Sequence, residues 1–265
     1  MQKKMTGCNK VRNCGGQLQS ESVCRGERRF LNKIIDTVLN IIYPRRCAVC
    51  HRILADQKSL CCPECRDVFQ VINNDYCMKC GKPVKPEEEY CTDCRGKHRN
   101  FDRGRSVFVY DDRMRRSLVR YKYYGNREYG RYFAGEICRH LGGEICRWKP
   151  DLIVPVPLTS AKRRRRGFNQ AEDLAEKVGL YTKIPVGTDI LRKDHDTRSQ
   201  KKLDAEERQR NLKGAFSAEQ PLNGLKLLII DDVYTTGSTM EAVSECLKNA
   251  GAGTVYFVTL AAGRL

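Results

Sequence analysis

The residues best suited to chemistry lie in one stretch near the C-terminus, where two adjacent carboxylates precede a run of hydroxyl-bearing residues. They are Asp231, Asp232, Thr235, Thr236, Gly237, Ser238 and Thr239. Four apolar residues at 227–230 come before them and a segment of helical character follows at 240–249, which predicts a buried strand, a loop and a helix. At such a junction, backbone N–H groups and hydroxyls can surround an anion at the positive end of the helix, and Gly237 lets the backbone approach it closely.

The two carboxylates need a different partner, because they would repel that anion. Asp231 and Asp232 can accept hydrogen bonds from sugar hydroxyls or hold a metal ion. A phosphate beside a vicinal diol describes a ribose 5-phosphate, which is the ligand that this junction predicts. The structural alternative is a buried strand and a helix that Asp232 or Thr235 merely caps, but paired acids that close an apolar strand are costly unless they are used.

Composition limits the class of protein. The chain has 265 residues, enough for one ordinary domain and a small one, and its formal net charge is +17 with a pI near 9.3. This excess favours polyanions such as nucleic acid, an acidic membrane or a phosphate-rich ligand, although a solvated basic surface gives the same charge. The chain begins with a polar, basic segment and no run approaches the ~18 apolar residues of a membrane span, so we expect a cytoplasmic protein.

Cysteines are abundant, and eight of the fifteen form four Cys-x-x-Cys pairs. The pairs are Cys47 and Cys50, Cys62 and Cys65, Cys77 and Cys80, and Cys91 and Cys94. Each pair places two thiolates on one side of a tight turn, and two pairs complete a closed, structural zinc site. The spacing indicates a duplicated unit with two zinc ions, but it leaves open whether the first pair joins the second or the third. Cys61 competes with Cys62, and His51 and His98 are spare ligands.

Elsewhere, strand and helix patterns alternate along the chain. Strands are predicted near 107–110, 151–158 and 254–260, and helices near 30–42, 114–119, 131–147 and 169–178. This alternation predicts a Rossmann-like, mostly parallel α/β sheet preceded by a zinc-bound module. We divide the chain into a disordered basic extension at 1–29, a helix with the zinc module at 30–100, and the α/β domain at 101–265. The helix at 30–42 either packs on the protein or lies on a membrane surface, and Cys138, Cys146 and Cys246 are predicted to be core thiols.

The segment 227–239 resembles the phosphoribosyl pyrophosphate (PRPP) motif of the type I phosphoribosyltransferases, with Tyr234 where a smaller aliphatic residue is usual. Together with the cysteine pairs and the stretch Arg166-Gly167-Phe168-Asn169-Gln170, it makes residues 30–265 similar to the ComF family of bacterial competence proteins, of the ComFC type. The resemblance implies a type I phosphoribosyltransferase domain and a double zinc ribbon whose cysteine pairs join in sequential order.

The resemblance also implies ligands for particular residues. Asp231 and Asp232 would hold the ribose diol of PRPP, residues 235–239 its 5-phosphate, and Mg²⁺ would accompany it. A lid is implied at four positions that match family strings, Arg198, Gln200, Arg208 and Asn211, although an exposed connector with a short helix near 205–210 fits the same residues. Lys122 either faces a phosphate or is a surface lysine between core tyrosines.

The basic segment at 159–168 has three interpretations. Its cations include Lys162, Arg163, Arg164, Arg165 and Arg166. In type I phosphoribosyltransferases the equivalent loop receives pyrophosphate, and cations beside flexible backbone suit that leaving group. A patch that grips the backbone of a nucleic acid and a solvated charge run are the alternatives.

Two functions from different classes follow. The first is a PRPP-dependent phosphoribosyltransferase, which would position its substrates and neutralise developing charge; no residue is identified as the general base. The second is a cytoplasmic single-stranded DNA-handling factor for natural transformation, a partner of the DNA-uptake machinery, whose PRPP site is vestigial or regulatory. The aromatics that lie near basic residues in the sequence would stack on its bases: Tyr121, Tyr123, Tyr124 and Phe168. The two combine in a PRPP-binding protein that acts in DNA uptake.

Overall fold

The structure is a computed structural model of the chain, and it describes residues 42–194 and 214–263. The chain divides into two compact units, Met1–Arg45 and Arg46–Leu265, and the second contains both the cysteine pairs and the sheet. Several predictions lie outside the described residues: the extension at 1–29, most of the helix at 30–42, and the lid residues Arg198, Gln200, Arg208 and Asn211. The domain boundaries at 30 and 101 stay a prediction.

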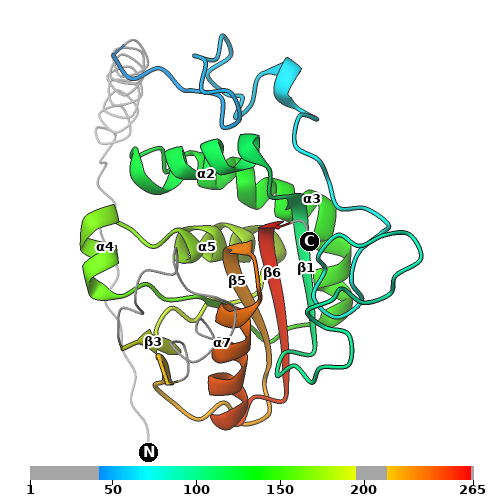
Figure 1. The fold of residues 1–265 in the computed structure, drawn as a ribbon. Coiled ribbons are helices and arrows are strands. Elements are labelled where there is room, and N and C mark those ends of the chain that lie inside the picture. Colours follow the sequence, from blue (N-terminus) through cyan, green and yellow to red (C-terminus); the bar gives the residue numbers. More distant parts are fainter. Residues whose placement is uncertain (1–41, 195–213, 264–265) are drawn as a thin grey trace, which may run out of the picture. The chain divides into compact units, whose positions relative to one another are not determined.

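Within the described residues, the centre of the second unit is a four-stranded, wholly parallel sheet in the order β1-β6-β5-β2 (Figure 1). Its strands are β1 (Arg103–Val109), β2 (Leu152–Pro155), β5 (Lys226–Tyr234) and β6 (Thr254–Ala262). A small antiparallel pair is formed by β3 (Leu191–Lys193) and β4 (Phe216–Ala218). The mostly parallel α/β sheet predicted from the alternating pattern is confirmed.

Helices cover both faces of the sheet, which explains why β5 begins with a continuous apolar run (Figure 1). Leu228 and Ile230 face a buried cluster with α2 (Asp112–Tyr123), α3 (Tyr129–Trp148) and α5 (Gln170–Thr182). Leu227 and Ile229 face a second cluster with α7 (Ser238–Asn249). Successive side chains of a strand point to opposite faces, so each face needs its own apolar residues.

Three local predictions are wrong. The predicted loop at 159–168 contains the helix α4 (Ser160–Arg166), because Thr159 caps its first turn and Gly167, with φ 77°, ends it. The strand that the carboxylates were predicted to close continues past them as β5 to Tyr234, because β6 pairs with it as far as that residue. Cys146 is exposed on α3 and is therefore not a core thiol.

Among the described residues, the eight paired cysteines form two clusters. The first contains Cys47, Cys50, Cys62 and Cys65, and the second Cys77, Cys80, Cys91 and Cys94, with the sulfur atoms of each cluster within 4.8 Å of one another. This arrangement confirms the sequential grouping and excludes the crossed one. Cys61 lies outside the first cluster and donates to the carbonyl of Cys62. The spare ligands are not used either, since His51 contacts the Tyr129 hydroxyl at 2.5 Å and His98 is exposed.

The two cysteine clusters pack on opposite faces of the sheet. Cys47 and Cys65 belong to the buried cluster of α2 and α3, where the Ser117 hydroxyl donates to the Ala48 carbonyl. The second cluster belongs to the core on the α7 side, which also contains Phe257 of β6. Four thiols converging in a buried site suit tetrahedral Zn²⁺. Each cysteine cluster thus shares a core with the α/β sheet.

A glycine of β1 tests this packing. The ring of Phe257 lies over Gly104, and a Cβ at this position would come within 2.1 Å of ring atoms. We expect Gly104→Ala to overpack the core and lower the free energy of unfolding by about 1–3 kcal/mol. Gly135→Ala on α3 is the matched control: its Cβ meets nothing within 4 Å, and alanine is favoured over glycine in a helix. Urea unfolding measures both, and a Gly104→Ala protein as stable as the wild type would contradict the packing.

Candidate functional site

The candidate site lies at the carboxyl end of β5, where open α/β sheets place their ligands. Asp231 is partly buried and Asp232 is 5% exposed, and Oδ1 of Asp231 accepts the backbone N–H of Asp232 at 2.8 Å. The predicted pair of carboxylates is therefore present as a pair. Its burial means that neighbouring groups must compensate the charge.

Two side chains from distant segments compensate Asp232. Nζ of Lys122, from α2, contacts Oδ2, and Nε2 of Gln170, from α5, donates to Oδ1 at 3.2 Å. Lys122 is thus not a surface lysine, since its side chain is only 19% exposed and forms an ion pair. Sequence patterns did not connect Gln170 with the carboxylates, although it belongs to the family-like stretch at 166–170.

The two carboxyl groups have pKa values shifted in opposite directions. Burial, followed by the charge of Asp232, raises the pKa of Asp231 to about 8. Burial also acts to raise the pKa of Asp232, but Lys122 more than offsets it and holds that pKa below its usual value. Near neutral pH the pair is therefore only partly ionised, with the charge on the carboxylate that Lys122 contacts.

The loop after the carboxylates leaves the start of α7 accessible to an anion. Gly237 is the N-cap residue, with φ 82°, and among the described residues no side chain caps the helix. The backbone N–H groups of the first turn therefore carry the positive end of the helix dipole without a side-chain acceptor. The hydroxyls of Thr236 and Ser238 lie 3.0 Å apart beside them, and residues 233–240 line a small cavity. The alternative that Asp232 or Thr235 caps α7 is wrong.

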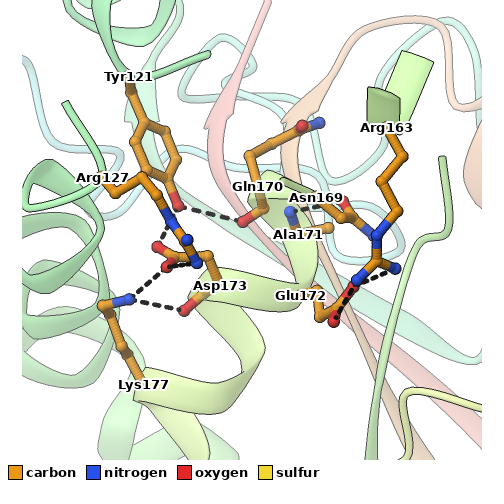
Figure 2. Close-up of polar contacts among 9 residues, drawn as sticks. All are labelled: Tyr121, Arg127, Arg163, Asn169, Gln170, Ala171, Glu172, Asp173 and Lys177. Atoms are coloured by element: carbon orange, nitrogen blue, oxygen red, sulfur yellow. Dashed lines mark hydrogen bonds and ion pairs between the residues drawn. The ribbon is translucent and has the colours of Figure 1, made fainter. Parts of the chain in front are cut away.

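The arginines of α4 divide into two pairs. Arg163 pairs with Glu172 of α5 at 2.9 Å (Figure 2). Arg166 donates to the Gln170 side chain at 2.7 Å and to the Tyr123 hydroxyl at 2.8 Å. Two arginines remain exposed and have no carboxylate partner within the described ranges: Arg164 and Arg165. The latter pair can meet an anionic ligand without breaking an ion pair.

The stretch at 166–170 ties α4, α5 and the carboxylates together. Asn169 caps α5 by accepting the N–H of Ala171 at 3.1 Å (Figure 2). Gln170 follows it and bridges Arg166 to Asp232. Figure 2 also shows Asp173, which accepts hydrogen bonds from Tyr121 of α2 and Lys177 of α5 at 2.6 and 2.5 Å. These contacts fix α5 against α2 and so hold Gln170 at the site.

A second concave region lies between α2 and the first cysteine cluster. It is a cavity of about 480 Å³ lined by His51, Arg115, Arg116, Val119, Arg120 and Tyr124. Neither Arg116 nor Arg120 pairs with a carboxylate in the part of the chain that the structure describes. Sequence patterns indicated Tyr124 but not these arginines, because only the folded structure shows that His51, from the segment of the first cysteine cluster, lines the same cavity.

Comparison with known proteins identifies the class. Residues 130–264 match the phosphoribosyl transferase domain, and residues 38–95 match the double zinc ribbon domain. The domain that contains the sheet therefore has a type I phosphoribosyltransferase fold, and a double zinc ribbon precedes it. None of the helices in the described residues has both the length and the apolar character needed to cross a membrane.

Relatives identify the family. Competence protein F of Haemophilus influenzae is 28% identical over 212 residues, covering 78% of this chain and 92% of that protein. DNA utilization protein YhgH of Salmonella typhimurium is 32% identical over 217 residues, covering 80% and 94%. Competence protein ComFC of Bacillus subtilis is 30% identical over 201 residues, covering 72% and 78%. The chain belongs to the ComF family of competence proteins, as the sequence motifs predicted.

The raised pKa of Asp231 makes stability depend on pH. Asp231 keeps its proton in the folded state up to about pH 8 but loses it near pH 4 when unfolded, so the free energy of unfolding should fall as the pH rises through this window. Asp231→Asn removes the cost of ionising a buried carboxyl. We expect it to raise the Tm at pH 8, by ~2–4 °C for each kcal/mol, and by less at pH 5.

Thermal unfolding of the ligand-free protein from pH 5 to pH 8 measures this difference. The exposed Asp112 of α2 supplies the control, and the effect of Asp112→Asn on the Tm should not grow with pH. A constant difference between Asp231→Asn and the wild type across the range would show that Asp231 is ionised throughout.

Proposed function

We propose that this protein binds PRPP with Mg²⁺ at the carboxyl end of β5 and transfers its phosphoribosyl group with release of pyrophosphate, in a cytoplasmic step of DNA uptake. The observation that carries the proposal is the combination of a dyad of adjacent carboxylates, Asp231 partly buried and Asp232 buried, with an uncapped helix N-terminus directly after them. Acceptors for a diol and donors for a phosphate thus lie on consecutive residues of one strand, loop and helix. The membership in the ComF family supports the link to DNA uptake.

Each part of PRPP has a counterpart among the residues. Asp231 and Asp232 accept hydrogen bonds from the ribose diol, and the loop at 235–239 binds the 5-phosphate. The exposed Arg164 and Arg165 of α4 meet the pyrophosphate, together with α4's remaining arginines once their present contacts exchange. Residues Arg198, Gln200, Arg208 and Asn211 are assigned to the lid.

Mg²⁺ fits the donor set, because carboxylate oxygens are ligands for hard cations. When bound, it would neutralise negative charge on the pyrophosphate. Asp231 would lose its proton on binding either the cation or PRPP, since both favour an ionised carboxyl. Lys122 would then balance a dyad that is fully ionised. Displacement at the anomeric carbon requires mainly positioning and charge neutralisation from these groups.

PRPP binding is tested by thermal shift. PRPP with Mg²⁺ should raise the Tm of the wild type, because a ligand at about 100 times its Kd stabilises the folded state by ~2.7 kcal/mol. The double variant Asp231→Asn, Asp232→Asn should abolish the shift. The chain has a second adjacent pair, Asp111 and Asp112 on α2, and the double variant Asp111→Asn, Asp112→Asn is the matched control that should keep it. An unchanged shift in the first variant would contradict the assignment of the site. If the shift is lost as expected, pyrophosphate release with a panel of amines and bases would identify the acceptor.

A second function, binding of single-stranded DNA, is favoured by the cavity between α2 and the first ribbon. Three arginines line it together with Tyr124, which is 71% exposed, and cations beside stacking aromatics are typical of single-strand grooves. The Arg166 guanidinium lies over the Tyr123 ring, 4.8 Å from its centroid, and the neighbouring Lys122 pairs with Asp232. Tyr121 and Phe168 were predicted to stack on bases, but both are buried, so this prediction is wrong for them.

Oligonucleotide binding separates the two basic surfaces. Affinity for a fluorescent oligo-dT should fall steeply with salt, and removing two phosphate contacts with Arg116→Ala, Arg120→Ala should reduce both the affinity and the salt slope, the slope by ~1.4. Arg164→Ala, Arg165→Ala tests α4 in the same way. Arg147→Ala, Lys226→Ala removes two exposed cations elsewhere and is the control. If oligonucleotide affinity depends neither on salt nor on the two arginine double variants, the DNA-binding role is rejected. The proposal of PRPP binding is tested separately by the thermal shift.

A further inference from the structure

Tyr234, the residue that departs from the usual PRPP motif, has a structural role. It is 1% exposed although it lies between the carboxylates and the loop at 235–239. Its ring stacks on Phe257 of β6, with centroids 5.0 Å apart and planes at 10°. Its hydroxyl lies directly beneath the loop, since a Cβ on Gly237 would come within 2.3 Å of it. The tyrosine is therefore the support on which the loop rests.

The same ring reaches the second cysteine cluster. Tyr234 shares one buried core with Cys77, Cys80, Cys91 and Cys94. The Tyr234 hydroxyl is buried and, within the described residues, makes no hydrogen bond. Burial raises its pKa, and the neighbouring Cys80 and Cys94 thiols raise it further. Phe101, just beyond this ribbon, meets Phe257 edge-on at 4.9 Å. A continuous set of contacts thus runs from the cysteines to the loop.

A second connection joins this ribbon to the helix after the loop. Asn100 donates from its backbone and its side chain to Oε1 of Glu241, at 3.0 and 2.7 Å. Arg99 pairs with Oε2 of the same carboxylate at 3.7 Å. Glu241 is 8% exposed and lies in the first turn of α7, so this contact fixes the turn whose N–H groups face the phosphate site. The first cysteine cluster, in contrast, packs on the opposite face with α2 and α3.

We propose that Tyr234 and Glu241 are positioning residues through which zinc at the second site holds the loop at 235–239 in its ligand-binding conformation. A ribbon of this size has too small a core to keep its shape without the metal, so loss of that zinc would remove the support of Tyr234 and the partner of Glu241. Because coupling between two binding sites is reciprocal, PRPP would in turn strengthen zinc binding at the second site. This last consequence rests on the proposed PRPP site, whereas the support of the loop does not.

Hydrogen exchange of the loop tests the support directly in the full, zinc-loaded chain. In Tyr234→Leu, with zinc content unchanged, the amides of the loop and of the first turn of α7, where the Glu241 N–H donates to the Gly237 carbonyl at 2.8 Å, should exchange faster than in the wild type. Tyr256→Leu is the matched control, because Tyr256 also lies on the sheet and stacks on an aromatic ring, that of Trp148, away from the loop. Cys91→Ser should give the same faster loop exchange as Tyr234→Leu, whereas Cys62→Ser at the first site should not. If Cys91→Ser does not fold, the two tyrosine variants decide.

Competition with a zinc chelator at equilibrium tests the reciprocity. Saturating PRPP with Mg²⁺ should raise the affinity for one of the two zinc ions by about 5- to 150-fold, and Tyr234→Leu should remove this effect while both ions still bind. Unchanged loop exchange in Tyr234→Leu overturns the proposal, as does equal protection of both ions by PRPP. A wild type whose Tm does not respond to PRPP refutes the proposed function instead, and loop exchange then still decides whether the zinc site supports the loop.

Discussion

Compensation of two adjacent carboxylates at the end of a buried strand is the constraint on which the rest of the structure depends. Asp232 is surrounded by core and would destabilise the fold by about 3–5 kcal/mol if its charge were left without a partner. Lys122 and Gln170 supply that compensation, and they come from helices on either side of β2 in the sequence. The packing of α2 and α5 is therefore inseparable from the electrostatics of the site.

Several hydrogen bonds between the helices position the side chains that compensate Asp232. The cap by Asn169 and the buried hydrogen bond between Tyr121 and Asp173 place Gln170 where it bridges Arg166 and Asp232. One side chain, that of Gln170, thus links α4 to the dyad by hydrogen bonds. The site is preorganised but not relaxed, because the raised pKa of Asp231 means that its carboxyl keeps a proton near neutral pH. Such stored electrostatic cost is typical of sites built to bind charge.

The double zinc ribbon packs into the hydrophobic cores on both faces of the sheet. Its two cysteine clusters enter different cores, one beneath α2 and one beneath the loop that follows the dyad. The segment of the first cysteine cluster also contributes His51 to the lining of the arginine-lined cavity. The ribbon module thus contacts both surfaces to which we assign ligands.

The sequence by itself determined the parallel sheet, the adjacent carboxylates, the hydroxyl-rich loop at 235–239 and the cysteine pairs, because these follow from the types and spacing of neighbouring residues. It failed at α4, where a cap and a terminal glycine outweighed the expectation of a charged loop. Only the tertiary structure decided that Lys122 and Gln170 contact Asp232, that Tyr121 and Phe168 are buried, and that Tyr234 shares a core with the second cysteine cluster. The physical reason is that burial and ion pairing depend on which distant segments meet, and local patterns do not contain that information.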